Sequence, residues 1–173
     1  MELEYGEKVK LDSKDRKILE QMQKNCRQTI AEIAKNTKLP RDVVVYRIKK
    51  LEQLKVIRAH HTLLNPQRLG YPLYVYVLFS CYNLNPEDEI KLVNYLKSYK
   101  KIIYVAKNSG EFDFTIGVCS KDYKEFDETV REIRQKFPDT IKDIKVTPVI
   151  QEYKYDWMVD LISIDKRGKN EKN

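Results

Sequence analysis

The sequence is poor in the residues that most metal and disulfide sites use. Its 173 residues include three cysteines, Cys26, Cys81 and Cys119, and two histidines, His60 and His61. The cysteines are odd in number, widely spaced and without a CxxC motif, so neither a disulfide framework nor a cysteine-based zinc site is expected. Adjacent histidines on an extended segment point to opposite faces and do not easily ligate one metal. We therefore expect no metal site and no cofactor.

Long apolar segments are also lacking. No uncharged apolar run approaches the ~18 residues that a membrane-spanning helix needs, and the longest, Tyr71–Tyr82, is typical of a strand. Residues 1–10 alternate acidic and basic side chains and have no apolar core of a secretory signal. We expect a cytoplasmic protein with no membrane partner. A hydrophobic content of 42% is enough for one large domain or two small ones.

The positive charge that the chain does have is concentrated in one region. Residues 12–70 carry 14 basic and 6 acidic side chains, a net charge of +8. Residues 71–153 carry 12 basic and 13 acidic side chains, a net charge of −1. This segregation favours a polyanion-binding domain joined to a neutral domain, with chance clustering in a lysine-rich chain as the alternative.

The basic segment has the pattern of three helices. Asp12 with Asp15 and Thr29 with Glu32 form capping boxes, which predict helices ending near residues 24 and 36. Pro40 is tolerated in a first helical turn and opens a third helix that runs to about residue 54. Two short helices joined by so tight a turn are typical of a helix-turn-helix.

The third helix has one apolar and one polar face. Val44, Ile48 and Leu51 form the apolar stripe. In a helix-turn-helix the second helix enters the DNA major groove, and its N-terminal half meets base edges. The predicted base-reading residues on the opposite face are Arg41, Asp42, Val45 and Tyr46. The predicted phosphate contacts are Lys38, Lys49, Lys50 and Arg58.

Two features beside this face allow more than one interpretation. Arg47, at the edge of the apolar stripe, either pairs with an acid of the first helix, such as Asp15 or Glu20, or contacts DNA. Residues 56–57 and 62–64 are expected to form short strands of a wing that carries the two histidines.

The neutral segment predicts an α+β domain. Strands are expected at residues 73–81, 102–106, 112–118 and 141–146, with helices at 86–99 and 121–137. The order strand, helix, strand, strand, helix, strand is that of a ferredoxin-like βαββαβ unit. Residues 149–153 are a candidate for one more strand. The expected divisions are an arm (1–11), a helix-turn-helix domain (12–58), a wing strand and linker (59–70), the ferredoxin-like domain (71–153) and a partly docked C-terminal extension (154–173).

Several short motifs occur in an order that resembles the Lrp/AsnC family, the leucine-responsive or feast/famine transcription regulators. The resemblance covers about residues 11–153. The motifs are Leu11–Asp12, Asp15–Leu19, Ala31–Ala34, Tyr46–Glu52, Val56–Ile57, Leu69–Tyr71 and Ser109–Phe114. Each is weak alone, and their joint order and spacing are specific. Lys55 and Pro40 depart from the pattern, because the family usually has Gly and often has Ser at these positions.

The resemblance implies a function and an assembly. The N-terminal unit would be a winged helix-turn-helix that binds double-stranded DNA. The C-terminal unit would bind an amino-acid effector between subunits and form homodimers through its sheet, often assembling further to tetramers or octamers. The effector would lie near the G-x-x-D turn, here Gly110, Glu111 and Asp113. From the residues alone, Asp113 could equally cap that turn.

Two other functions are alternatives to a regulator without catalysis. Sirohaem decarboxylases are similar to the family in both domains, but their His-Asn-Tyr-x-Arg and Asn-x-Trp-Phe stretches are not present at residues 104–108 and 111–114. We therefore expect no enzyme. An amino-acid-sensing assembly protein without a DNA target is the other alternative, and the intact basic helix-turn-helix argues against it.

Overall fold

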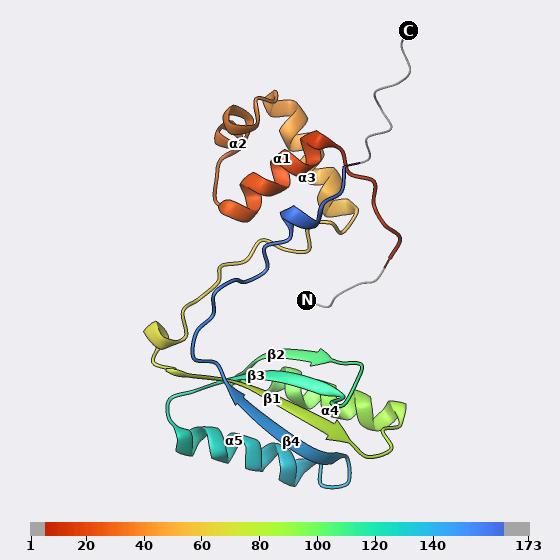
Figure 1. The fold of residues 1–173 in the computed structure, drawn as a ribbon, viewed down its shortest axis with the longest axis vertical. Coiled ribbons are helices and arrows are strands. Elements are labelled where there is room, and N and C mark those ends of the chain that lie inside the picture. The colour runs from red at the N-terminus through yellow and green to blue at the C-terminus, as the bar shows by residue number, and fades with distance from the viewer. Residues whose placement is uncertain (1–5, 165–173) are drawn as a thin grey trace. The chain divides into compact units, whose positions relative to one another are not determined.

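The computed structural model describes residues 6–164 and divides the chain into two compact units (Figure 1). The first unit contains the described residues up to Thr62 and those from Lys154 onward, and the second contains Leu63–Tyr153. The chain therefore leaves the first unit once and returns to it after completing the second. No helix among the described residues is long and apolar enough to cross a membrane.

The first unit contains the predicted helix-turn-helix. Its helices are α1 (Ser13–Lys24), α2 (Ile30–Thr37) and α3 (Arg41–Gln53). Asp12 and Thr29 cap α1 and α2 through complete capping boxes, as their spacing predicts. Pro40 is the N-cap of α3 and makes no side-chain capping bond.

A small apolar core holds the three helices together. Ile18 of α1, Ile33 and Ala34 of α2, and Val44 of α3 are buried against one another. Asn36 donates from its amide to the side-chain oxygens of Gln21 and Gln28, which ties α2 to α1 and to the turn between them.

The predicted wing strands are wrong. Among the described residues the first strand begins at Leu73, and residues 56–64 are irregular. Lys55 adopts a left-handed conformation with φ 57°, which directs the N–H groups of Val56 and Ile57 to the carbonyl oxygen of Leu51. These amides therefore cap the end of α3 and are not available for a strand ladder. His60 and His61 lie in this irregular segment.

The second unit is the predicted ferredoxin-like fold. After a 3₁₀ turn (Gln67–Leu69), its elements are β1 (Leu73–Cys81), α4 (Pro86–Ser98), β2 (Ile102–Lys107), β3 (Phe114–Ser120), α5 (Tyr123–Lys136) and β4 (Ile141–Pro148). The strands form one antiparallel sheet in the order β2-β3-β1-β4.

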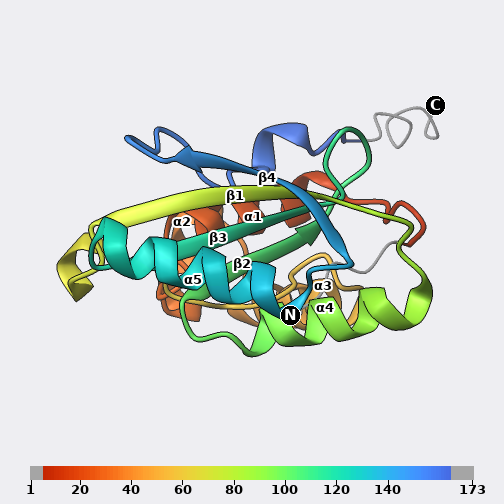
Figure 2. The same cartoon turned by 90° about the horizontal axis from the view of Figure 1, so that it is seen from below.

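Alternation along the strands gives the sheet a covered face and an open face. Val75, Val77 and Phe79 of β1 are buried together with Leu96 of α4 and Ile133 of α5. Both helices pack on this face (Figure 2). The intervening β1 side chains, which include Tyr76 and Leu78, point to the other face.

Two segments differ from the sequence-based expectation. Strand β3 begins two residues later than predicted, because the backbone and carboxylate of Asp113 bond to β1 residues and to the turn. Residues 149–153 form no strand, although the N–H of Val149 bonds to the carbonyl oxygen of Tyr74.

The C-terminal segment belongs to the first unit as far as Ile164, the last residue described. It contains a short 3₁₀ helix, η2 (Val159–Leu161), which packs against α1. Residues 165–173 lie outside the described part of the chain.

Candidate nucleic-acid interface

Helix α3 presents a continuous exposed face. Val44 and Leu51 are fully buried on its inner side. Arg41 and Asp42 are exposed in the first turn, and Val45 and Tyr46 in the next are 50% and 68% exposed. The structure thus brings the four predicted base-reading residues together on one surface. That surface offers a guanidinium, a carboxylate, an apolar contact and a phenol, which are groups that can read base edges.

Arg47 lies between the two faces and turns inward. Its Nη1 atom bonds to both carboxylate oxygens of Asp12 at 2.8 Å and to Asp15 Oδ1 at 2.7 Å. Of the two interpretations from sequence, the ion pair with α1 is the one observed. The acids are Asp12 and Asp15, whereas Glu20 pairs with Lys24. Arg47 therefore fixes α3 against the start of α1.

The Asp12 carboxylate both caps α1 and pairs with Arg47. Burial disfavours its charge, but hydrogen bonds from the Asp15 N–H, Arg47 and the Lys14 N–H outweigh burial and lower the pKa of Asp12. The carboxylate therefore stays ionised at neutral pH, which maintains the helix cap and the ion pair together.

Cationic side chains flank the exposed face. Lys38, Lys49, Lys50 and Arg58, the predicted phosphate contacts, are all exposed. Lys38 ends α2 in a left-handed conformation with φ 58°, immediately before α3. Beyond α3, His60 Nε2 lies 2.9 Å from Glu52 Oε1, which connects the irregular segment to the helix.

The predicted effector turn lies in the second unit and has a defined geometry. Gly110 adopts φ 141°, in the region that favours glycine. The Asp113 carboxylate accepts a hydrogen bond from the N–H of Cys81 at 2.6 Å, so it caps the end of β1. Glu111 is exposed beside it. Burial, together with Asp113 and Glu89, raises the pKa of the Cys81 thiol to about 11.

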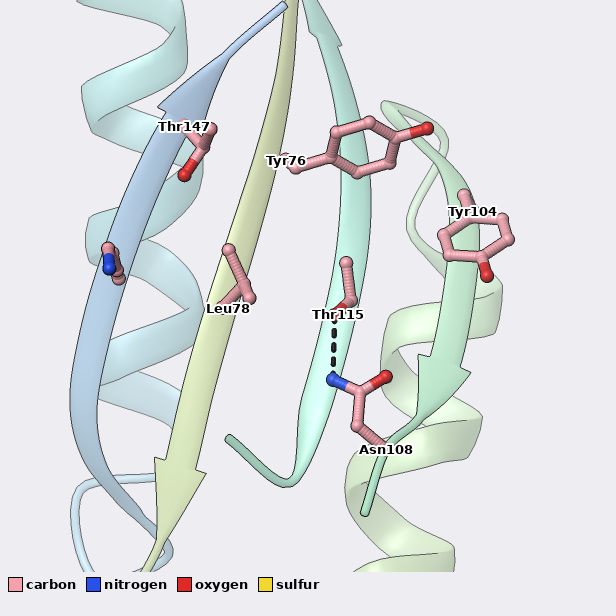
Figure 3. A pocket seen from close by; sticks show the side chains of 7 residues that line it. Tyr76, Leu78, Tyr104, Asn108, Thr115 and Thr147 are labelled. Carbon is pink, nitrogen blue, oxygen red and sulfur yellow. Dashed lines mark hydrogen bonds between the residues drawn. The ribbon is translucent and has the colours of Figure 1, made fainter. Parts of the chain in front are cut away.

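The open face of the sheet contains a shallow cavity that the sequence analysis did not identify. It is about 430 Å³ in volume and is lined by Tyr76, Leu78, Tyr104, Asn108, Thr115, Lys145 and Thr147 (Figure 3). The Asn108 amide donates to Thr115 Oγ1 at 2.7 Å across its floor. The strict alternation of β1 was the signal that could have found it, because Tyr76 and Leu78 must face away from the core.

A cluster of tyrosines lies beside this cavity. The Tyr74 hydroxyl donates to the Tyr76 hydroxyl at 2.9 Å, and the Tyr76 and Tyr104 rings meet edge to face. Gly117 lies beneath them on β3, where a Cβ atom would come within 3.0 Å of the Cβ of Tyr104 and 3.1 Å of the Tyr74 ring. Glycine at this position therefore lets the aromatic side chains lie close to the strand.

Comparison with known proteins gives a consistent result. Residues 11–52 match the AsnC-type helix-turn-helix domain. The chain is 30% identical over 118 residues to the HTH-type transcriptional regulator FL11 of Pyrococcus abyssi, covering 68% of this chain and 76% of the relative.

Two solved structures share the fold over most of the chain. One is an AsnC family transcriptional regulator from Agrobacterium tumefaciens, with a TM-score of 0.75 and 24% identity, covering 84% of this chain and 94% of the other. The other is a transcriptional regulator from Neisseria meningitidis in complex with L-Met, with a TM-score of 0.75 and 22% identity, covering 84% and 93%.

Proposed function

Because the chain belongs to the Lrp/AsnC family of DNA-binding transcriptional regulators, we propose that it recognises its operator through the exposed face of α3. The observation that carries this proposal is that α3 has one face packed against the unit and one face exposed. Arg47 and the apolar stripe hold the helix from inside, while Arg41, Val45 and Tyr46 remain exposed on its N-terminal half. Like the regulators it matches, the chain acts in this proposal by binding and carries out no chemical step.

The exposed residues divide into two roles. Arg41, Asp42, Val45 and Tyr46 read bases in the major groove, since an N-terminal recognition-helix residue lies nearest the base edges. Lys38, Lys49, Lys50 and Arg58 contact phosphates and set register and affinity without sequence preference. Their exposure and positive charge support this role.

Charge reversal on α3 tests the DNA-binding face. In Tyr46→Glu, a carboxylate is placed at a 68% exposed position, so duplex affinity is expected to fall by about tenfold or more. The measurement is fluorescence anisotropy with a duplex recovered by selecting bound fragments from the source genome. Tyr123→Glu, at a 72% exposed position of the second unit, is the matched control. Equal affinities for the two variants would contradict the proposed face.

The two roles are separated by a second pair of variants. Arg41→Ala is expected to change the preference at one base pair, by roughly 1–3 kcal/mol. Lys49→Ala is expected to weaken all duplexes about equally and to reduce the salt dependence of binding. Uniform effects from both variants would remove Arg41 from the base-reading set.

We also propose that an amino acid or similar small effector binds between subunits at the turn of Gly110, Glu111 and Asp113. Gly110 has a positive φ, and a turn of this kind can present backbone amides to a carboxylate. A carboxylate such as Asp113 suits an ammonium group. The Neisseria meningitidis regulator with the same fold, whose structure is a complex with L-Met, supports the ligand class. The subunits pair in this proposal through the open sheet face.

A thermal-shift screen of amino acids tests the effector site. We expect one amino acid to raise the melting temperature of the protein, and Asp113→Asn to abolish the rise because the carboxylate charge is lost. The asparagine oxygen can still accept the Cys81 N–H bond, so the turn is retained. Asp139→Asn, an exposed change in the same unit, serves as control. A regulator without an effector is indicated if no amino acid acts at millimolar concentration.

A further inference from the structure

The first unit contains a cavity that the proposed function does not use. It is about 440 Å³ in volume, within the range of small-molecule sites. Four segments line it: the N-terminal arm, α1, the irregular residues 56–61 and the C-terminal residues 156–163. All belong to the same compact unit, whereas the proposed effector turn belongs to the other.

The C-terminal wall of this cavity is held in place by one side chain of α1. Gln23 Oε1 accepts hydrogen bonds from the N–H groups of Met158 at 3.0 Å and Val159 at 2.8 Å. Gln23 Nε2 donates to the carbonyl oxygen of Asp156 at 2.8 Å. Val159 is 3% exposed, so the segment is docked by packing as well as by polar contacts. The cavity is therefore part of the folded unit.

The interior of the cavity is apolar and incompletely covered. Leu11, Leu19, Met22 and Ile57 contribute to its lining. Leu161 lines the same cavity and is nevertheless 76% exposed, and Met158 is 55% exposed. A ligand with a hydrocarbon or aromatic body would remove this apolar surface from water.

The charged residues around the cavity are mainly cationic. Lys8 and Arg58 contribute to the lining, against a single acid, Asp156, and the two histidines His60 and His61 lie beside them. Within residues 6–164, the Arg58 guanidinium has neither a hydrogen bond nor an ion pair. A carboxylate matches an unpaired guanidinium through two parallel hydrogen bonds. We propose that this cavity binds a small apolar monoanion, a carboxylate on a hydrocarbon or aromatic body.

The test uses the intact chain and its single tryptophan. Trp157 lies in the docked segment between two lining residues and donates to Asp160 Oδ2 at 2.8 Å, so its fluorescence reports on the cavity wall. Octanoate is expected to give a saturable fluorescence change. Its uncharged counterpart octanamide is expected to bind at least about tenfold more weakly, because it lacks the carboxylate charge.

Two variants locate the binding site. Leu161→Glu places a second anion in the cavity at an exposed position and is expected to weaken octanoate binding at least about tenfold. Leu69→Glu, at a 58% exposed position of the second unit, is expected to leave binding unchanged. Arg58→Gln is expected to weaken octanoate binding without altering octanamide binding. Unchanged melting temperatures of the variants show that the fold is retained.

Several results would overturn the proposal. One is equal binding of octanoate and octanamide. Another is an octanoate affinity that Arg58→Gln or Leu161→Glu leaves unchanged. The third is the absence of a saturable response at millimolar octanoate. The titration contains no DNA, so its outcome is independent of the proposed function.

The position of Arg58 adds a consequence for DNA binding. Arg58 is also a proposed phosphate contact, so a bound carboxylate competes with DNA for the same guanidinium. Saturating octanoate is expected to weaken duplex binding in the unmodified protein and to have no effect on duplex binding in Arg58→Gln. Only this competition experiment rests on the proposed function. Unchanged duplex affinity in the unmodified protein would remove the competition and leave the ligand site in place.

Discussion

At the residue scale, Arg47 controls how firmly α3 is held against α1. Its guanidinium bonds to two carboxylates, and Asp15, one of them, has a side chain that is only 5% exposed. A buried carboxylate that loses its partner keeps its desolvation cost, so such pairs are costly to break even where they add little net stability. The orientation of the proposed DNA-binding face of α3 therefore depends on a residue that does not itself belong to that face.

Removal of the guanidinium tests this dependence. Arg47→Ala is expected to lower the free energy of unfolding of the first unit by about 2–3 kcal/mol, because the buried Asp15 carboxylate loses its cationic partner and keeps only the Asp12 N–H. Arg131→Ala breaks an exposed pair with Asp127 and is expected to cost less than about 1 kcal/mol. Chemical denaturation measures both: Trp157 fluorescence follows the first unit, which contains Arg47, and circular dichroism follows the whole chain, including the second unit with Arg131. A similar small loss from the two variants would show that the Arg47 contacts do not hold the unit together.

At the element scale, the end of α3 determines the path of the chain beyond it. Lys55 has φ 57°, and the N–H of Val56 bonds to the carbonyl oxygen of Leu51 at 2.9 Å, as in a Schellman motif. A residue with a Cβ is disfavoured in this conformation. The sequence therefore has a non-optimal residue at the position where α3 stops.

Glycine at this position is expected to be stabilising. Lys55→Gly should raise the free energy of unfolding by about 0.5–1 kcal/mol, because glycine adopts the left-handed conformation without steric cost. Lys50→Gly, inside α3, is the matched control and should lower it by about 1 kcal/mol. Thermal melts of both variants provide the comparison. Destabilisation by Lys55→Gly would mean that the left-handed turn is not the native conformation in solution.

The same elements indicate why sequence reasoning succeeded in some places and failed in others. The starts of α1 and α2 could be predicted because a capping box involves side chains only three residues apart. The absence of the wing strands from the described residues could not be predicted. The amides of the residues after α3 cap this helix because Lys55 has a left-handed backbone angle, which lysine rarely adopts. A short sequence pattern predicts hydrogen bonds between nearby residues, but it fails where a residue adopts an unusual backbone angle.

The candidate sites also differ in how far the sequence predicts them. The exposed face of α3 follows from helical periodicity, so its members could be named in advance. The exact partners of Arg47 required the packing angle between α1 and α3. The docking of residues 156–159 on Gln23 joins positions more than 130 residues apart, and no local pattern encodes it.

At the scale of the whole molecule, the second unit has one uncovered sheet face. Tyr104 is 46% exposed on this face, beside the cavity lined by Tyr76 and Leu78. An antiparallel sheet with helices on one side either faces water or pairs with another surface. Exposed tyrosine rings and aliphatic side chains favour pairing of this face with another protein surface, which agrees with the proposed assembly of subunits.

A charge placed on this face tests the assembly. Leu78→Lys is expected to lower the molar mass relative to the unmodified protein, because in the proposed assembly two ammonium groups would be buried between the paired sheets. Ile90→Lys, at a 59% exposed position on α4, is the control and is expected to leave the mass unchanged. Size-exclusion chromatography with light scattering gives the molar mass. The same mass for Leu78→Lys and the unmodified protein would indicate that subunits meet elsewhere.

The return of the chain to the first unit has a further consequence for cleavage. A protease that cuts once between residues 63 and 72 breaks the covalent link on one side of the second unit. The link at Tyr153–Lys154 survives, and the fragment that carries it stays attached to α1 through the bonds of Gln23 and the packing of Val159. The nicked protein should therefore still migrate as one particle under native conditions and separate into two pieces only in denaturant.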